Sequence, residues 1–293
     1  MKATFYFYKT CYRVASQNKK GKTMYLQANQ SIRCWLFSAL ALFGCLPSLS
    51  HAELEVGLGM SAVHVPHYIG SDEAEDFYLP FPYLRYRSEK ISVDRNLIQA
   101  NLWRTGNWSL EISLGGAVKV DSDKNEARQG MSDLDFIIEA GPALHYYFHG
   151  DRKQENALYF ELPLRGAIST DFIEADYRGY TFNPRMVWRR GYQMGPYEVR
   201  PQLTVGLRSA SSHYHDYTYG VSAEDVTEQR HQYKAQGGYG GFQLGYSTAV
   251  LWSDWLVAGF MRYVNISGAT YEDSPLVKKE NSVLIGVASA YLF

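Results

Sequence analysis

Cysteine is almost absent from this chain of 293 residues, and the position of the few that exist is informative. The three cysteines, Cys11, Cys34 and Cys45, all lie near the start, so no cysteine follows residue 45. A disulfide, a cysteine-ligated metal site and a thiol nucleophile are therefore excluded for the rest of the chain.

Acidic residues are missing from residues 1–52, which contain seven lysines and arginines. Residues 53–293 therefore hold 22 Lys+Arg against 30 Asp+Glu, a net charge of about −8, although the whole chain carries only −1. A segment with this excess of negative charge is unsuited to binding phosphates, so we expect no nucleic-acid partner.

The basic start continues into the apolar run CWLFSALALFGCLPSL at 34–49 and then Ser50-His51-Ala52. These are the three parts of a secretory signal peptide, with small residues at positions −3 and −1 of a cut after Ala52. We predict a leader over 1–52, of which 1–23 precede Met24 and could be an over-called start, and one mature domain over 53–293. A lipoprotein cut before Cys45 is the rival interpretation, which Phe43 fits poorly.

Long hydrophobic runs are absent after residue 52, so the sequence predicts no membrane-spanning helix there. Alternation with a period of two is present instead. In 198–208 one parity is wholly apolar and the other polar, and the same pattern recurs in 110–120 and 158–165. Each of these segments suits a strand with one apolar face.

Three features favour a membrane barrel over a soluble sandwich. The alternating segments reach ten residues, as tilted membrane strands require, and aromatic residues make up 15% of the chain, as interfacial girdles require. The terminal segment 282–293 alternates small and bulky residues to its last position. Because backbone groups in lipid must all be paired within the protein, we predict an all-β fold, a transmembrane antiparallel up-and-down β-barrel.

About twelve strands are predicted, with ten possible because 90–102 changes parity near residue 95 and a bulge or a missed turn could lie there. They fall at 53–64, 77–87, 90–102, 108–120, 133–148, 157–169, 180–190, 197–208, 213–221, 238–251, 255–265 and 281–293. The connection 252–254 is short, whereas 266–280 and 222–236 are long. This asymmetry predicts a periplasmic C-terminus.

Candidate catalytic and metal-binding groups are few. His213 and His215 would share a strand face and form a possible metal pair, but we expect a solvated strand end. A G-x-S-x-G motif is absent, so a serine hydrolase would need a serine beside one of His64, His67, His145, His149 or His213. The acid pairs Asp121/Asp123 and Asp133/Asp135 could form a paired-carboxylate site or bind calcium, although clustered loop acids are usually solvated. We expect no cofactor.

Charged residues on the inward parity have mixed signs, which predicts a lumen that is cross-linked, narrow or weakly selective. They are Glu111, Lys119, Glu161, Arg165, Glu198, Arg200 and Arg208.

The stretch PHYIGSDEAEDFYLPFPY at 66–83 resembles the opening of the MipA/OmpV family of outer-membrane proteins. It does so through Pro66, Tyr68, Gly70, Ser71, Pro80 and Pro82. The segment YTYGVS at 217–222 is similar to a second family segment, through Tyr217, Tyr219 and Gly220. Gly70 would permit a tight turn, whereas Pro80 and Pro82 lack ladder donors and would require an edge or a bulge.

The resemblance, which covers 53–293, implies a protein of the Gram-negative outer membrane, in contact with its lipid. Family members are described as scaffolds that hold a murein lytic transglycosylase and a penicillin-binding protein together. No catalytic residues come with the family. Tyr291 and Phe293 resemble a signal for the barrel-assembly machinery. A porin-like channel for small solutes and, less favoured, a lipid-modifying barrel hydrolase are the alternatives.

Overall fold

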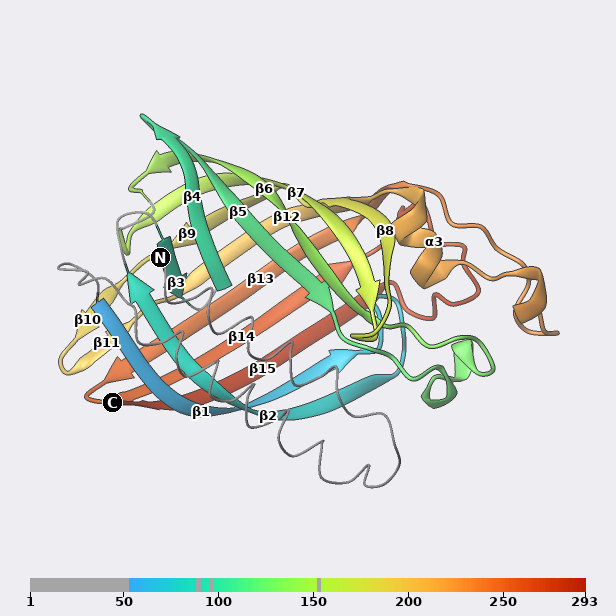
Figure 1. Cartoon of the computed structure of the whole chain (residues 1–293), viewed down its shortest axis with the longest axis horizontal. Coiled ribbons are helices and arrows are strands. Elements are labelled where there is room, and N and C mark those ends of the chain that lie inside the picture. Colours follow the sequence, from blue (N-terminus) through green and yellow to red (C-terminus); the bar gives the residue numbers. More distant parts are fainter. Residues whose placement is uncertain (1–52, 88–90, 95–96, 152–153) are drawn as a thin grey trace, which may run out of the picture. The chain divides into compact units, whose positions relative to one another are not determined.

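Antiparallel strands form one sheet that closes on itself (Figure 1). The computed structural model describes residues 53–87, 91–94, 97–151 and 154–293, so the predicted leader lies outside the described residues. The strands are β1 (Glu53–Pro66), β2 (Ala74–Arg87), β3 (Ile91–Asp94), β4 (Leu97–Thr105), β5 (Trp108–Ala117), β6 (Phe136–His149), β7 (Ala157–Thr170), β8 (Ala175–Phe182), β9 (Arg185–Arg189), β10 (Tyr192–Met194), β11 (Tyr197–Val199), β12 (Gln202–Ala210), β13 (Gly238–Trp252), β14 (Trp255–Asn265) and β15 (Asn281–Leu292).

The last strand pairs with the first, which closes the barrel. β15 runs antiparallel to β1 from the pair Gly57–Leu292 to the pair His64–Ile285. One residue further, the amide of Phe293 donates to the carbonyl of Val56 at 2.9 Å. The final residue of the chain is therefore held within the sheet, as the alternating terminal segment predicts.

Several of the fifteen strands are parts of longer strands that are interrupted by short breaks. β8 and β9 both pair with β7. β9 pairs with β12 and β10 pairs with β11, and the register continues from one pair to the other. β11 and β12 likewise both pair with β13. When each interrupted strand is counted once, the described residues form twelve strands. This equals the predicted number because 90–102 contributes two strands instead of one and 213–221 contributes none.

One predicted strand, 213–221, is wrong, because this segment contains the helix α3 (Ser212–Tyr219). The Ser211 side chain accepts the amide hydrogen of Tyr214 and caps the helix. The segment 90–102 contains two strands, β3 and β4, whose connection lies outside the described residues.

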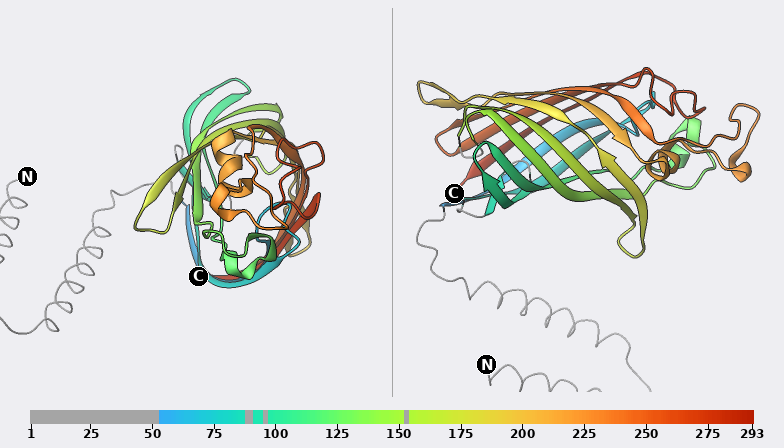
Figure 2. Two further views of the ribbon diagram at one scale, coloured as in Figure 1. Left: turned by 90° about the vertical axis from the view of Figure 1, so that its right-hand side faces the viewer. Right: turned by 90° about the horizontal axis from the view of Figure 1, so that it is seen from above.

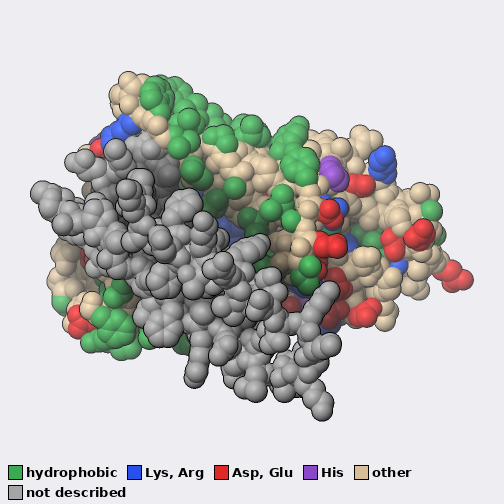
Figure 3. All heavy atoms as spheres, viewed as in Figure 1, with side chains coloured by type: hydrophobic (Ala, Val, Ile, Leu, Met, Phe, Trp, Pro, Cys, Tyr) green, Lys and Arg blue, Asp and Glu red, His purple; other side chains and the backbone are tan. Residues whose placement is uncertain are grey.

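Along β15 and its neighbour β1, side chains on the outward parity are mostly large and apolar, and the inward side chains of β15 are mostly small. Leu58, Met60 and Val287 are exposed on the outside, whereas Ser282 and Ala290 are buried on the inside. Figure 3 shows hydrophobic side chains along the upper edge of the wall and charged ones gathered near α3. Among the described residues, no helix has both the length and the apolar character that a bilayer span requires.

The two ends of the barrel differ in their connections. The end near the C-terminus, called here the terminal end, has short turns such as 106–107 and 253–254. The opposite end, called the loop end, carries the long connections 118–135, 211–237 and 266–280. These contain α3 and the short 3-10 helices η1 (Ser122–Lys124), η2 (Glu126–Arg128) and η3 (Ala223–Asp225). The predicted short and long connections around β14 are confirmed.

Candidate functional site

Long loops pack together across the loop end of the barrel and form a cap with its own apolar core. Figure 2, left, shows α3 and the loop 118–135 lying across the mouth of the barrel. The buried core residues are Tyr68, Val120, Leu134, Tyr219, Val221, Ala235, Val264, Ile266, Ala269, Tyr271 and Leu276. Because these residues come from four separate stretches of the chain, at 68, 120–134, 219–235 and 264–276, the cap is a tertiary structure and not a set of independent loops.

Residues of the two family segments meet inside this cap. The rings of Tyr68 and Tyr219 contact edge to face, with centroids 6.1 Å apart. The Tyr219 hydroxyl donates to the carbonyl of Ile69 at 2.8 Å, and its ring stacks on Tyr271 at 3.8 Å. The Tyr68 hydroxyl donates to the carbonyl of Leu276 at 2.8 Å. Burial raises the pKa of Tyr68 to about 12, so both phenols stay neutral donors.

Gly70 and Ser71 fix the turn that follows β1, which itself ends at Pro66. Gly70 has φ +98°, a conformation that favours glycine, and its amide donates to the Ser282 hydroxyl at 2.9 Å. Its carbonyl accepts the amides of Lys278 and Lys279. The tight turn expected at Gly70 therefore ties the first loop to the last.

Arg128, which the sequence analysis did not single out, is the polar centre of the cap. Its side chain is only 3% exposed and donates to the carbonyls of Thr218 and Ser132, each at 3.0 Å, and to the Ser122 hydroxyl at 3.2 Å. Burial lowers the pKa of its guanidinium. Asn125, also buried, donates to the Ser71 hydroxyl at 3.1 Å. Both side chains join the loop 118–135 to the family segments.

Tyr217 and Gly220 line a surface pocket of about 440 Å³ in the cap. The Tyr217 hydroxyl accepts the amide hydrogen of Asp135 at 2.8 Å, and Arg178 lies 4.3 Å above its ring. Charged residues around the pocket are Arg128, Asp133, Asp216, Asp225 and Lys234. The pocket therefore offers a mixed polar surface rather than a site of one charge sign.

The backbone nitrogens of the two prolines in the family motif point away from β1. Val56 bonds to Phe293, so even-numbered residues of β1 bond to β15 and odd-numbered ones bond to β2. Odd-numbered residues of β1 pair with odd-numbered residues of β2. Pro80 and Pro82 are even-numbered, so they do not bond to β1. An N–H group at either position would point toward the other neighbour of β2, and proline has no such group.

That other neighbour is nearly absent in the described part of the wall. β2 pairs with β3 only at Tyr86 and Arg87, while its ladder with β1 runs without a bulge. Of the two alternatives expected for Pro80 and Pro82, an edge and a bulge, the structure has the edge.

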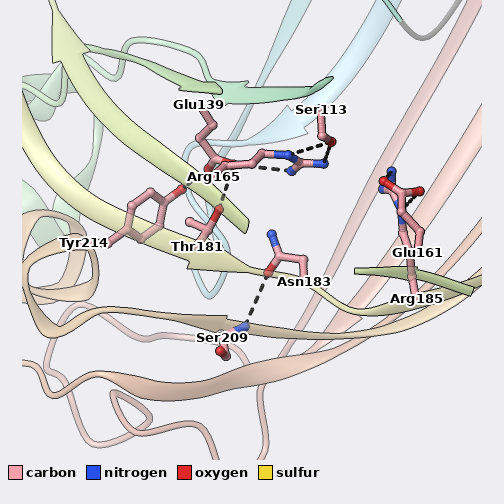
Figure 4. A network of polar contacts seen from close by, with 9 residues as sticks. All are labelled: Ser113, Glu139, Glu161, Arg165, Thr181, Asn183, Arg185, Ser209 and Tyr214. Carbon is pink, nitrogen blue, oxygen red and sulfur yellow. Dashed lines mark hydrogen bonds and ion pairs between the residues drawn. The ribbon is translucent and has the colours of Figure 1, made fainter. Parts of the chain in front are cut away.

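Charged side chains inside the barrel are joined in networks (Figure 4). Arg165 donates to the Ser113 hydroxyl at 2.7 Å and to Glu139 at 3.4 Å, and Glu139 accepts the hydroxyl of Tyr214 at 2.8 Å. These contacts join α3 to the wall, because Tyr214 belongs to that helix.

Other predicted inward charges are paired as well, except Arg208, whose buried Nε has no hydrogen-bond partner. Arg185 donates twice to Glu161, at 2.7 and 2.8 Å. Arg200 pairs with Glu198 and, at 3.4 Å, with Glu155. Glu111 accepts the Ser109 hydroxyl at 3.1 Å, whereas Lys119 lies beyond the end of β5 and pairs with Asp133 at 3.2 Å. The cross-linked lumen that the mixed charges predict is present in the structure.

Histidines and serines come close to each other at two places without a direct hydrogen bond. Ser109 lies opposite His145 across the ladder, but its hydroxyl donates to Glu111. Ser71 and His67 both contact Asn125, which lies between them. His64 pairs with the carboxylate of Asp76 at 2.7 Å. His149 and His213 have no hydrogen bond to a serine among the described residues.

Neither candidate metal site, which the sequence analysis already disfavoured, has the arrangement that metal binding would need. His213 and His215 lie on a helix, so they do not share the strand face that the pattern assumed. Asp121 accepts the amide of Asp123, and Asp133 accepts the amide of Ser122 at 2.9 Å, which lowers the pKa of its carboxyl. The described part of the chain contains no group of three or more potential metal ligands.

The terminal aromatic residues lie in a cluster at the terminal end. The ring of Tyr291 contacts Trp255 at 5.3 Å and Phe293 at 5.6 Å between centroids. An apolar depression of about 560 Å³ beside them is lined by Leu58, Met60, Pro80, Pro82 and Tyr291 among others. Because it lies on the apolar outer parity, its chemistry matches lipid chains.

A family model described as "MltA-interacting protein MipA" matches residues 58–293. Outer membrane protein Omp26La of Vibrio anguillarum is 34% identical over 221 residues, which are 71% of this chain and 76% of that protein. Outer membrane protein OmpV of Vibrio cholerae is 33% identical over 90 residues, 30% of this chain and 34% of that protein.

Solved structures also match this chain, at low similarity. Neisserial surface protein A matches with a TM-score of 0.23 and 9% identity, over 83% of this chain and 99% of that chain. OccK8 of Pseudomonas aeruginosa matches with a TM-score of 0.22 and 8% identity, over 75% of this chain and 70% of that chain. At TM-scores this low the likeness carries no argument about function.

Proposed function

The chain belongs to the outer-membrane family of the MltA-interacting protein MipA, and from this premise we propose that it is a non-enzymatic scaffold for murein-remodelling enzymes. Its terminal end would face the periplasm and hold a murein lytic transglycosylase together with a penicillin-binding protein. The observation that carries this proposal is the closed, cross-linked barrel, in which the cap covers the mouth and ion pairs join the lumen walls.

A closed and cross-linked barrel supports a rigid framework better than an open pore. The cap buries eleven core residues at the loop end, and Glu139 bonds both to the wall and to α3. Water-filled porins instead keep a continuous polar channel. The porin alternative would be favoured over the scaffold if the pure protein gave stable single-channel steps in planar bilayers.

The terminal end offers a surface on which a periplasmic partner could dock. The hairpin of β10 and β11 exposes Tyr192, Met194 and Tyr197, with Met194 exposed to 63%. β10 pairs with β11 and has no second neighbour among the described residues. Exposed aromatic and methionine side chains beside an unpaired strand edge suit binding of an extended peptide.

Crosslinking in intact envelopes tests the scaffold. A photoreactive amino acid at Met194 is expected to capture murein synthases and hydrolases, identified by mass spectrometry. The matched control is Ile173, which is 90% exposed at the turn between β7 and β8, at the loop end. Equal capture from both positions, or no murein enzyme from position 194, would contradict the proposal.

The C-terminal residues would act earlier, during insertion. Tyr291 belongs to the last strand, which closes the barrel, and Phe293 follows that strand and bonds to Val56 of β1. We propose that this strand is recognised by the barrel-assembly machinery before it pairs with β1. The aromatic cluster that it forms with Trp255 supports an interfacial position for this part of the strand.

A further inference from the structure

The apolar depression of about 560 Å³ on the outer face of the barrel lies where the last strand pairs with the first. Residues from four adjacent strands line it, in two rows that run across β14, β15, β1 and β2. Figure 1 shows β15, β1 and β2 next to each other near the C-terminus. The row nearer the terminal end is Trp255, Tyr291, Leu58 and Pro82, and the next row contains Ser289, Met60 and Pro80.

Small side chains form the floor of this depression. On β15, Ser289 lies between the larger outward residues Val287 and Tyr291. On β2, the compact rings of Pro80 and Pro82 occupy the corresponding outward positions. The ladders of β1 with β15 and with β2 run without a break, so the depression is made by side chains and is not a gap between strands.

Long apolar side chains form the rim. Leu58 and Met60 are exposed to 64% and 58%, and the rings of Trp255 and Tyr291 stand beside them. On an outer-membrane barrel the outward parity contacts lipid, so hydrocarbon chains are the neighbours of this depression. Its lining atoms would lose their dispersion contacts if the space stayed empty. We therefore expect one lipid chain to occupy it.

The two aromatic residues indicate the depth of the depression in the membrane. Trp and Tyr side chains gather where the hydrocarbon meets the lipid headgroups. Ser289 lies two residues further along β15 than Tyr291, which is about 7 Å along the strand. The depression thus begins at the level of the headgroups and extends into the first part of the acyl region.

A carboxylate stands at the headgroup end of the depression. Asp254 is exposed in the turn between β13 and β14, and its carbonyl accepts the amide of Leu292 at 2.7 Å. Its carboxylate accepts the hydroxyls of Tyr291 and Ser253, at 3.5 and 3.4 Å. Among the side chains that the structure describes, none of positive charge pairs with Asp254. Its charge therefore attracts an ammonium group and repels a lipid of net negative charge.

We propose that this depression binds one acyl chain of a zwitterionic phospholipid, whose ammonium group lies at Asp254. The chain would pack on Ser289 and between Leu58 and Met60. Because the bound lipid would contact both β1 and β15, it would stabilise the pairing that closes the barrel. The small floor, the aromatic rim and the carboxylate are separate observations that fit one such lipid. This binding goes beyond the proposed scaffold and does not depend on it.

Native mass spectrometry of the folded protein, released from neutral detergent after incubation with defined lipids, tests the charge. Given equal amounts of phosphatidylethanolamine and phosphatidylglycerol with the same chains, we expect about fivefold more of the former to be retained. Asp254→Asn should remove this preference. Glu224→Gln, at an exposed acid of the loop end, is the matched control and should keep it. Equal retention of the two lipids by the unchanged protein would overturn the proposal.

Filling the depression tests the place. Ser289→Leu puts a larger side chain on the floor and should remove most of the retained lipid, whereas Ser289→Ala leaves the space open and should keep it. Ala140→Leu is the matched control, because it adds a leucine at an exposed position of β6, away from β1 and β15. If Ser289→Leu retained as much lipid as Ala140→Leu, the depression would not be the site and the proposal would fail.

Photolabelling in bilayers distinguishes a bound lipid from the bulk. A phosphatidylethanolamine with a diazirine in its acyl chain, present as a minor component, is expected to label Leu58 and Met60 more strongly than Leu164, an exposed residue of β7. Even labelling would show bulk lipid only, and a dimer that Ser289→Leu abolishes would show a second copy in the depression. Either result would contradict the proposal. Heat-modifiable mobility on gels confirms that each variant is folded, so that a loss of lipid reports on the depression.

Discussion

Tyr68 and Tyr219, from two segments far apart in the chain, meet edge to face in the core of the cap. Tyr219 also bonds to the backbone next to Tyr68, at Ile69, and stacks on Tyr271. The two segments by which the sequence resembles its family are thus parts of one structure. Their residue types follow from packing in the cap, which explains them without a catalytic role.

Removing parts of Tyr219 should weaken the cap in steps. Tyr219→Phe keeps the stacked ring and loses the bond to Ile69, which should cost about 1 kcal/mol of the free energy of cap opening. Tyr219→Ala also leaves a cavity, which should cost about 3 kcal/mol or more. Hydrogen exchange of the cap amides in the folded barrel measures both values. Identical protection in the two variants would contradict the role assigned to the ring.

Replacing Arg128 should open the loop 118–135. Arg128→Met leaves the carbonyls of Thr218 and Ser132 without their buried donor, which should cost about 2–3 kcal/mol of local stability. Faster cleavage of this loop by protease reports the loss. Lys124→Met is the matched control, because Lys124 is exposed in the same loop, and it should leave the cleavage rate unchanged. Similar rates for the two variants would count against Arg128 as the polar centre.

Acid should loosen the cap through His215. Burial lowers the pKa of this histidine below its usual value of 6.5, although its bond to the carbonyl of Gln236 opposes the shift. The neutral ring therefore stabilises the fold fully above pH 6.5. This contribution falls by at most about 1.4 kcal/mol per pH unit below 6.5, until the pH reaches the lowered pKa of the folded state.

Hydrogen exchange of the cap amides between pH 7.5 and 5 checks this, after correction for the intrinsic pH dependence of exchange. The unchanged protein should lose protection on acidification, and His215→Gln should lose less. His213→Gln is the control, since His213 is exposed on the same helix. If His215→Gln responded to acid as strongly as the control, another group would be responsible.

Shortening the chain by one residue should impair barrel closure. Deleting Phe293 removes the amide that donates to Val56 and the ring that contacts Tyr291. The amount of heat-modifiable, folded protein in the outer membrane should fall several-fold. Phe293→Tyr keeps both features and should insert normally, whereas equal insertion of the deleted and the tyrosine variants would exclude a role for the last residue.

Sequence patterns predicted the barrel because strand alternation is local and is set by the lipid outside. The terminal strand shows this most clearly, since its small and bulky residues alternate to the last position. The same rule failed for α3, where aromatic residues alternate although the segment is helical. There the cap at Ser211 and the bond from Tyr214 to Glu139 override the pattern, and the second of these is visible only in three dimensions.

The candidate sites were only partly predictable for a similar reason. The family motif pointed to Tyr68 and Gly70, whose surroundings the structure then showed. Arg128 gave no signal, because most of its partners are backbone carbonyls, which have no counterpart in the residue sequence.

The seam between the first and the last strand imposes an order of events on biogenesis. β1 is the first described strand to be synthesised and β15 the last described one, so the seam between them cannot form until β15 has been made. A polypeptide that lacks β15 because of a nonsense codon would have two unpaired strand edges that cannot join. Such fragments would be natural targets for envelope proteases, so the seam would make the lifetime of the protein depend on the synthesis of both strands.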